Sequence, residues 1–364
     1  EVGQIYRPGI DVFYTREFYR DARKRLKPGG LVAQFVPLGF LPEASFKSVV
    51  ATFLEVFPAA GLWYNTQELL LIGGLDEAPR LDLERLRELK RASRDPAGEG
   101  ETSRVARDLA WNHWGGTRHH LVNPGAMVGG FLADAEGLRT MATGAAVYVD
   151  DIPRLAYETR DSQLMDHHEE PMARYLGRHL APFAQGVIGS LEPAEGALAE
   201  ETRRLNLRDL VASGLVAQVV QSQGRAPART QMELLQRALK LNPENFRANA
   251  NAGKLLLMSG QAARSEPFLV KAVQLRPEAV DALRDLGMMY IVTERPALAL
   301  PHLQKAVRLD PEEFGVRNYL GSALAMTGDP AGAIVHFEKA LELKPGDPSV
   351  LQNLERARVG AEGR

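Results

Sequence analysis

Four pentapeptides set the period of the C-terminal half of this chain: NPENF (242–246), RPEAV (276–280), DPEEF (310–314) and KPGDP (344–348). The proline in each lies 34 residues from the next. The same step separates three further sets of residues: Gly253, Gly287 and Gly321; Ala238, Ala272, Ala306 and Ala340; and Leu235, Leu269, Leu303 and Phe337. A fixed period of this length indicates an array of repeated helix pairs.

The residue types at these positions fit the packing of such an array. Glycine and alanine let two helices approach closely, leucine or phenylalanine fills the space between them, and proline opens the turn to the next pair. The 34-residue pattern resembles the tetratricopeptide repeat. It predicts complete repeats beginning near Phe246, Val280 and Phe314, a degenerate repeat over residues 209–242, and a capping helix over residues 349–359.

The first helices of the repeats are expected to line a groove for an extended peptide or protein segment. The peptide-binding candidates in this groove are Arg247, Lys254, Arg284, Met288 and Asn318, with Asp281 and Ser322 beside them and Leu257 as a further apolar contact. Three cations against one acid predict a net positive groove, suited to an acidic segment or a C-terminal carboxylate. The alternative is a solvated face that binds nothing.

A second informative stretch lies upstream: FYTREFYRDARKRLKPGGLVAQFVPL, residues 13–38. Thr15 is a good N-cap, and an apolar stripe of Phe18, Ala22 and Leu26 predicts a short helix. The Pro-Gly-Gly sequence then ends the helix, and residues 31–36 form an apolar run typical of a strand covered on both faces. Together they predict the second half of an α/β unit.

The following residues extend this layer. A stripe of phenylalanine, valine and leucine over residues 46–57 predicts an amphipathic helix that ends at Pro58. Apolar runs on both sides of residues 65–68 predict a hairpin, and residues 145–149 predict one more strand. We expect a sheet of about three strands from residues 31–36 and the hairpin.

The stretch at 13–38, with SFKSVVATFLEVFP (45–58), GLWYN (61–65), ELLLIGG (68–74) and DDIPRLAY (150–157), resembles spermidine synthase-like (polyamine aminopropyltransferase-like) proteins. The resemblance covers residues 1–182 and implies a Rossmann-like methyltransferase-type fold. It implies S-adenosylmethionine or decarboxylated S-adenosylmethionine as the cofactor of a longer parent protein. The nucleotide-binding half would precede Glu1, so we expect no cofactor on the residues present.

The resemblance also implies site residues. Asp150 and Asp151 would lie beside the substrate pocket, although an aspartate before proline is also an ordinary turn residue. Gln4 stands where aminopropyltransferases carry an acidic residue, and Gln4 cannot act as a general base. Glu1 is the nearest carboxylate. The catalytic residue therefore stays open among these four candidates.

Composition limits the alternatives. The 364 residues contain no cysteine and carry a net charge of −2, which excludes disulfides and gives no reason to expect nucleic acid as a partner. No apolar run is long enough for a membrane span. The cluster at residues 166–170 has adjacent histidines, whose side chains diverge on a helix, so no metal site is predicted.

These observations predict an α/β plus all-α protein. The expected domains are a partial spermidine synthase-like domain at 1–185, a helical connector with the degenerate repeat at 186–227, and tetratricopeptide repeats with a capping helix at 228–364. The expected function is a transferase acting on a polyamine-type acceptor, with an appended interaction module and no activity in this stretch alone. The alternative is a non-catalytic scaffold with a degenerate transferase-like domain. We expect a cytoplasmic location. The alternative is that these residues form the cytoplasmic part of a membrane-tethered parent protein.

Overall fold

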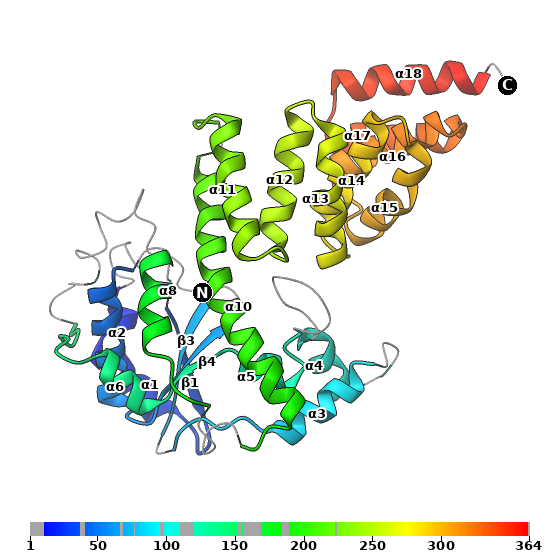
Figure 1. The fold of residues 1–364 in the computed structure, drawn as a ribbon. Helices are drawn as coiled ribbons and strands as arrows, with labels where there is room; N and C mark the ends of the chain where they lie inside the picture. The colour runs from blue at the N-terminus through cyan, green and yellow to red at the C-terminus, as the bar shows by residue number, and fades with distance from the viewer. Residues whose placement is uncertain are drawn as a thin grey trace. The chain divides into compact units, whose positions relative to one another are not determined.

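The computed structural model describes residues 11–36, 41–65, 68–75, 77–94, 98, 100–109, 120–150, 155, 169–183, 189–222 and 224–362. The chain divides into two compact units (Figure 1). The N-terminal unit comprises Glu1–Gln221 with Lys240–Asn242, and the repeat unit comprises Ser222–Leu239 with Pro243–Arg364. The expected domain boundaries at residues 185 and 227 stay predictions.

The N-terminal unit contains a small antiparallel sheet with the strand order β1-β3-β2-β4. Its strands are β1 (Leu31–Val36), β2 (Gly61–Asn65), β3 (Glu68–Gly74) and β4 (Phe131–Ala133). The predicted hairpin is confirmed as the β2–β3 pair. Since every pairing among the described strands is antiparallel, a Rossmann-like sheet is not shown by these residues.

Two expectations about strands were wrong. Residues 145–149 form no strand, because the backbone N–H of Tyr148 donates to the Thr52 hydroxyl at 2.9 Å and ties this segment to a helix. The fourth strand is instead the short segment β4. The strand β1 is not covered on both faces: Leu31 is 56% exposed, whereas Val36 is fully buried. β1 is an edge strand of the described sheet.

The helix α1 (Arg16–Arg25) follows the 3-10 turn η1 (Asp11–Tyr14) and begins as predicted, with the Thr15 side chain accepting a hydrogen bond from the Phe18 N–H. Its predicted stripe is only half-buried. The fully buried side chain of α1 is Tyr19, whose ring packs edge-on against Phe53 at 5.0 Å between ring centroids. Tyr19 therefore fixes α1 to the core.

The other helices of this unit are α2 (Glu43–Val56), α3 (Leu83–Ala92), α4 (Glu101–Leu109), α5 (Pro124–Val128), α6 (Ala135–Met141), α8 (Glu169–Arg178) and α10 (Pro193–Gln221). α2 confirms the predicted amphipathic helix, and Phe46 and Phe53 on it are fully buried. α10 packs on α5 and α8 and covers most of the expected connector as one 29-residue helix.

The repeat unit consists of paired helices. They are α11 (Ala228–Leu241), α12 (Phe246–Met258), α13 (Ala262–Leu275), α14 (Val280–Val292), α15 (Pro296–Leu309), α16 (Phe314–Met326), α17 (Pro330–Leu343) and α18 (Pro348–Glu362). The three predicted repeats are the pairs α12/α13, α14/α15 and α16/α17, and α18 is the predicted capping helix. Pro267 and Pro301 lie inside continuous helices.

The glycines of the repeats lie where the paired helices approach most closely. A Cβ atom on Gly253 would be 2.6 Å from Leu269, one on Gly287 would be 2.5 Å from Leu303, and one on Gly321 would be 2.7 Å from Phe337. Leu269, Leu303 and Phe337 are at most 1% exposed. The packing that the 34-residue pattern predicts is therefore the packing observed.

Candidate peptide-binding groove

The first helices of the repeats line two open pockets. The α12–α14 pocket has a volume of about 470 Å³, and the α16–α18 pocket has a volume of about 400 Å³. Most of their lining residues lie on α12 and α14 or on α16 and α18. Because the repeats place equivalent residues of successive helices side by side, side chains far apart in the sequence meet in these pockets.

The structure brings three of the predicted cations together. Arg247 and Lys254 on α12 and Arg284 on α14 all line the α12–α14 pocket, with the predicted acid Asp281. Arg247 and Lys254 are exposed. Among the described residues, no carboxylate forms an ion pair with either of these two side chains.

Arg284 is in a different situation, because three carboxylates surround it. Its guanidinium forms ion pairs with Asp281 at 2.8 Å, Asp285 at 2.9 Å and Glu313 at 2.9 Å. Burial opposes its charge, yet Asp285, Glu313 and Asp281 outweigh burial and raise the pKa of Arg284. The side chain is fully engaged within the repeat unit and is not available to a peptide.

The expectation of a net positive groove with a single acid was therefore wrong. Asp285, Asp310 and Glu313 also line the α12–α14 pocket. The DPEEF motif at residues 310–314 predicts a turn, and this turn places Asp310 and Glu313 at the wall of the pocket. The pocket has a cationic side on α12 and an acidic side around Arg284.

Arg276, which the sequence pattern did not indicate as a groove residue, lies in the turn before α14 and lines the same pocket. Its guanidinium lies 4.5 Å from the ring centroid of Phe246, a cation–π contact. Burial lowers the pKa of Arg276, and the neighbouring charge of Arg247 lowers it further. The cationic side of the pocket thus holds two arginines that repel each other.

The remaining predicted residues do not line the α12–α14 pocket. Met288 is half-buried against the core of the repeat unit, and Leu257 is only 7% exposed, so Leu257 is a core residue and not a groove contact. Asn318 accepts a long hydrogen bond from Asn353 at 3.4 Å, and the Ser322 hydroxyl donates to the Asn318 carbonyl at 3.0 Å. Asn318 thus lies beside the α16–α18 pocket, where Ser322 is a lining residue.

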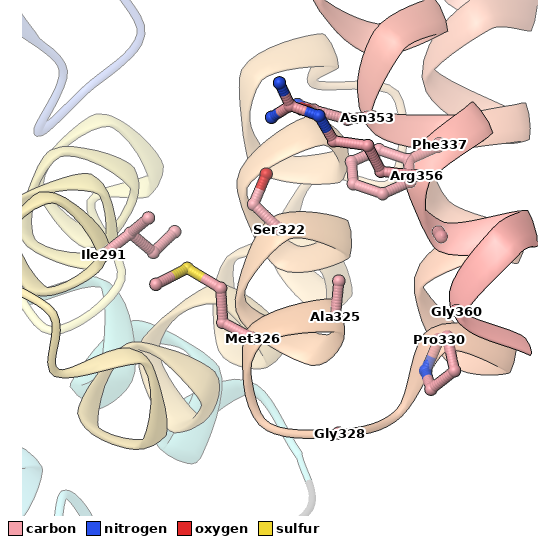
Figure 2. A pocket seen from close by; sticks show the side chains of 11 residues that line it. Ile291, Ser322, Ala325, Met326, Gly328, Pro330, Phe337, Asn353, Arg356 and Gly360 are labelled. Carbon is pink, nitrogen blue, oxygen red and sulfur yellow. The ribbon is translucent and has the colours of Figure 1, made fainter. Parts of the chain in front are cut away.

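The α16–α18 pocket combines apolar and polar walls (Figure 2). Met326 lies beside Ile291 on one side, and Asn353 and Arg356 of α18 lie across from them (Figure 2). Ala325, Pro330 and Phe337 add apolar surface. No acidic residue lines this pocket among the described residues.

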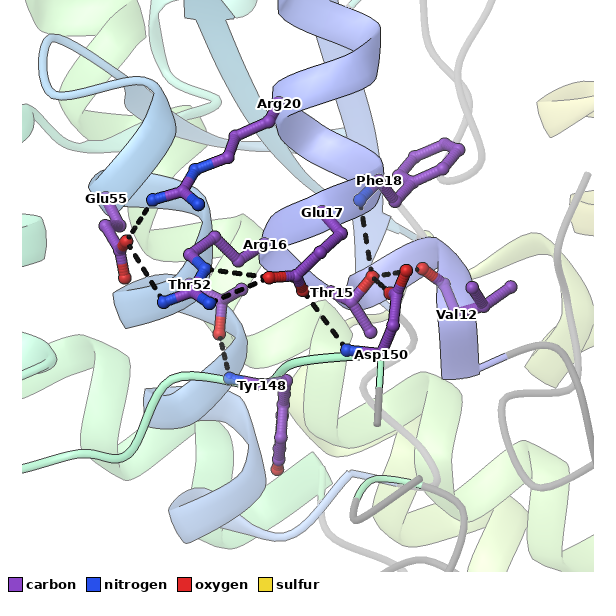
Figure 3. Close-up of polar contacts among 10 residues, drawn as sticks. All are labelled: Val12, Thr15, Arg16, Glu17, Phe18, Arg20, Thr52, Glu55, Tyr148 and Asp150. Atoms are coloured by element: carbon purple, nitrogen blue, oxygen red, sulfur yellow. Dashed lines mark hydrogen bonds and ion pairs between the residues drawn. The ribbon is translucent and has the colours of Figure 1, made fainter. Parts of the chain in front are cut away.

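Asp150 is part of a polar network at the start of α1 (Figure 3). The Thr15 hydroxyl contacts a carboxylate oxygen of Asp150, and the Asp150 N–H donates to the Glu17 carboxylate at 3.1 Å. The Arg16 N–H donates to the Tyr148 carbonyl at 3.0 Å. This segment is therefore joined to the N-terminus of α1. Glu1, Gln4 and Asp151 lie outside the described residues.

Other kinds of site are not apparent in the described part of the chain. None of its helices has the length and apolar character needed to cross a lipid bilayer. Its histidine, aspartate and glutamate residues form no group of three or more suited to a metal ion.

Comparison with known proteins agrees with the helix pairs. A family model described as Tetratricopeptide repeat matches residues 253–314 and 284–348. Curated proteins gave no match. The helix pairs of the repeat unit are tetratricopeptide repeats, and proteins with such repeats bind peptides or other proteins.

Solved structures with likeness to this chain include the MamA RS-1 ArsTM double mutant, with 27% identity and a TM-score of 0.35, covering 41% of this chain and 87% of that chain. YrrB, titled a TPR protein with an unusual peptide-binding site, has 18% identity and a TM-score of 0.35, covering 44% of this chain and 81% of its own. The first TPR domain of human RPAP3 has 16% identity and a TM-score of 0.32, covering 34% of this chain and 96% of that chain.

Proposed function

We propose that this chain is a protein-interaction scaffold whose repeat unit binds an extended segment of a partner protein. The observation that carries the proposal is the cationic side of the α12–α14 pocket. Arg247 and Lys254 are exposed there, without an ion pair to any described carboxylate, and Arg276 lies beside them. Like charges held close together favour an anionic ligand, since the ligand relieves their repulsion.

The charges that line the pocket also restrict which partner segments can bind. An acidic side chain would form charge-assisted hydrogen bonds with Arg247 and Lys254. A run of acidic residues would meet Asp281, Asp310 and Glu313 on the opposite side and be repelled. We therefore propose a segment with an isolated acidic residue, flanked by neutral or basic residues, as the preferred partner.

The test is a peptide-array screen of the whole chain at low and high salt, comparing wild type with the double variant Arg247→Glu/Lys254→Glu. Each exposed contact contributes about 0.5–1 kcal/mol, so the double variant should lose about fivefold to thirtyfold in affinity at low salt and less at high salt. Arg284 is left unchanged, because removing it would leave Asp285 buried without its cation.

A matched control is Lys305→Glu/Arg308→Glu, which changes charge equally on α15 and alters no lining residue of either pocket. It should bind like wild type. If the groove variant keeps the same peptides with the same salt response, the scaffold proposal for this pocket fails.

A second candidate function concerns the N-terminal unit. We propose that it is a transferase-like domain that places a polyamine-type acceptor near Asp150 and Asp151. The contact between Thr15 and Asp150 supports this, since it joins two of the sequence blocks on which the resemblance rests. The S-adenosyl cofactor would belong to a longer parent protein. The other catalytic candidates, Glu1 and Gln4, lie outside the described residues.

The acceptor proposal can be tested by titrating spermidine into wild type and Asp151→Asn in a calorimeter. Loss of one charge-assisted hydrogen bond costs about 1.5–3 kcal/mol, so the variant should bind at least about tenfold more weakly. Equal affinities would make Asp151 an ordinary turn residue.

A further inference from the structure

One repeat position shows a regular apolar surface that stops at α18. Met258, Val292 and Met326 end the first helix of each repeat, 34 residues apart, and they are 75%, 51% and 51% exposed. The next residue in this series is Gly360. Gly360 has no side chain to continue the series, and both Gly360 and Met326 line the α16–α18 pocket.

The absence of a side chain at Gly360 is not forced by packing. A Cβ atom there would come no closer than 3.9 Å to Pro330, which is ordinary contact. Gly253, Gly287 and Gly321 differ, since a Cβ on each of them would clash with a buried leucine or phenylalanine. Gly360 therefore opens the pocket without being needed for helix packing.

The two walls of the α16–α18 pocket have different chemistry. Ile291, Ala325 and Met326 present apolar surface, and half of the Met326 side chain is exposed. On α18, Arg356 is exposed, and no described carboxylate forms an ion pair with it. This distinguishes Arg356 from Arg284, whose charge is neutralised within the repeat unit.

We infer that the α16–α18 pocket binds an apolar residue and an acidic residue two positions apart within an extended partner segment. In an extended chain, residues two apart point to the same face about 7 Å from each other. The apolar side chain enters beside Met326 and Gly360, and the acidic side chain pairs with Arg356. Asn353, which lies one turn before Arg356 on α18 and also lines the pocket, has the amide groups to hydrogen-bond the backbone of the segment.

This inference deepens the proposed function, on which it rests, by naming the residues that the partner presents at a second place in the groove. The acid is internal to the segment and is not a chain-terminal carboxylate. Among the described residues that line this pocket, Arg356 is the one cation, so one acidic residue suffices for charge complementarity.

The test uses short Gly/Ser peptides with a central Leu-Ser-Glu, acetylated and amidated at their ends, and measures fluorescence polarisation with the whole chain. A Leu-Ser-Gln peptide removes the acidic side chain, and a Ser-Ser-Glu peptide removes the apolar one. A further peptide that ends in a free carboxylate after Leu tests whether a chain-terminal carboxylate can replace the internal acidic residue. We expect the internal Leu-Ser-Glu peptide to bind most tightly.

Three variants test the protein side. Gly360→Leu fills the pocket and should reduce binding at least about tenfold, while leucine in place of glycine favours the helix. Arg356→Gln should reduce binding about threefold to fivefold, the size expected of an exposed ion pair. Arg358→Gln is the matched control, because Arg358 lies on the same helix but pairs with Glu338 at 3.0 Å and lines neither pocket.

Each outcome either supports or overturns the inference about the α16–α18 pocket. Unchanged binding in Gly360→Leu with an intact thermal transition overturns the inference, as does equal binding of the Leu-Ser-Glu and Ser-Ser-Glu peptides or a requirement for the free carboxylate. If Arg247→Glu/Lys254→Glu weakens array binding while Gly360→Leu does not, the proposed function stands and only this inference fails. If neither variant changes binding, both fail.

Discussion

At the scale of single residues, the repeat unit depends on glycines that touch large side chains. Gly287 lies against Leu303, which is fully buried. Two opposing effects act on a substitution there. Alanine favours a helix over glycine by up to about 1 kcal/mol, whereas overpacking a core costs about 1–3 kcal/mol.

Gly287→Ala should be net destabilising, because its Cβ would be 2.5 Å from the Leu303 side chain. We expect a loss of about 1–2 kcal/mol in the free energy of unfolding. Urea unfolding followed by circular dichroism measures it, and the midpoint should fall. Gly360→Ala, with no close neighbour, should keep or raise the midpoint. A higher midpoint for Gly287→Ala than for wild type would mean that the helix pair can widen freely.

At the scale of helices and strands, α8 and α10 meet around a buried carboxyl group. Glu169 at the start of α8 is 8% exposed, and a Cβ on Gly214 of α10 would be 2.6 Å from its carboxyl carbon. Burial raises the pKa of Glu169 to about 7. Asp209 and Glu169 also act on Tyr64, whose pKa is raised chiefly by burial. The helices therefore favour a protonated Glu169.

The N-terminal unit should consequently lose stability as the pH rises. The folded state holds the proton of Glu169 up to about pH 7, whereas the unfolded state releases it near its ordinary pKa of 4.5. The stabilisation is fully present below that lower value and is lost through about pH 7, by as much as about 3 kcal/mol. Thermal unfolding of wild type and Glu169→Gln across this range measures it.

The Glu169→Gln variant should have a flatter pH profile than wild type. The control Glu170→Gln changes the exposed neighbour on the same helix and should keep the wild-type slope. Identical slopes for wild type and Glu169→Gln would show that Glu169 is charged in the folded protein.

Some of these elements could be predicted from the sequence and others could not, for physical reasons. The helix pairs could be predicted because Gly253 and Leu269 of one pair carry the packing within a single repeat. The strand β4 could not, because three residues show no periodicity. Tyr148 lies in a run with strand character, yet a hydrogen bond to the Thr52 side chain holds it against α2.

The candidate groove was predicted in position but not in charge. Arg247 and Lys254 could be placed on one face of α12 from helical periodicity alone. The ion pairs of Arg284 with Asp285 and Glu313 could not, since they depend on where the next turn folds back onto α14. Short-range patterns thus identify the residues of a groove, while its net charge depends on contacts between repeats.

At the scale of the molecule, the two units should differ in how they behave alone. In the described part of residues 228–364 the regular elements are all helices, α12 to α18 each pack on the next, and there is no open strand edge. We expect this piece to be soluble and to melt cooperatively. The piece 1–222 carries β1 at the edge of the described sheet, and an open edge favours aggregation.

The experiment expresses both pieces and follows helicity on heating. The N-terminal piece should end at residue 222 and not at residue 195, because a cut at 195 would remove most of α10 and its packing on α5 and α8. A soluble piece 1–222 with a cooperative transition would contradict the edge-strand argument.

The spacing between each glycine and its buried partner also constrains how this gene can change length. Gly253–Leu269, Gly287–Leu303 and Gly321–Phe337 are each 16 residues apart and lie within one 34-residue period. Recombination that gains or loses one whole period therefore keeps each glycine together with its buried partner. The array can therefore gain or lose whole repeats during evolution, whereas an insertion of any other length must be accommodated in a turn. The groove would then change its length in steps of one repeat, and each step would add or remove one binding position.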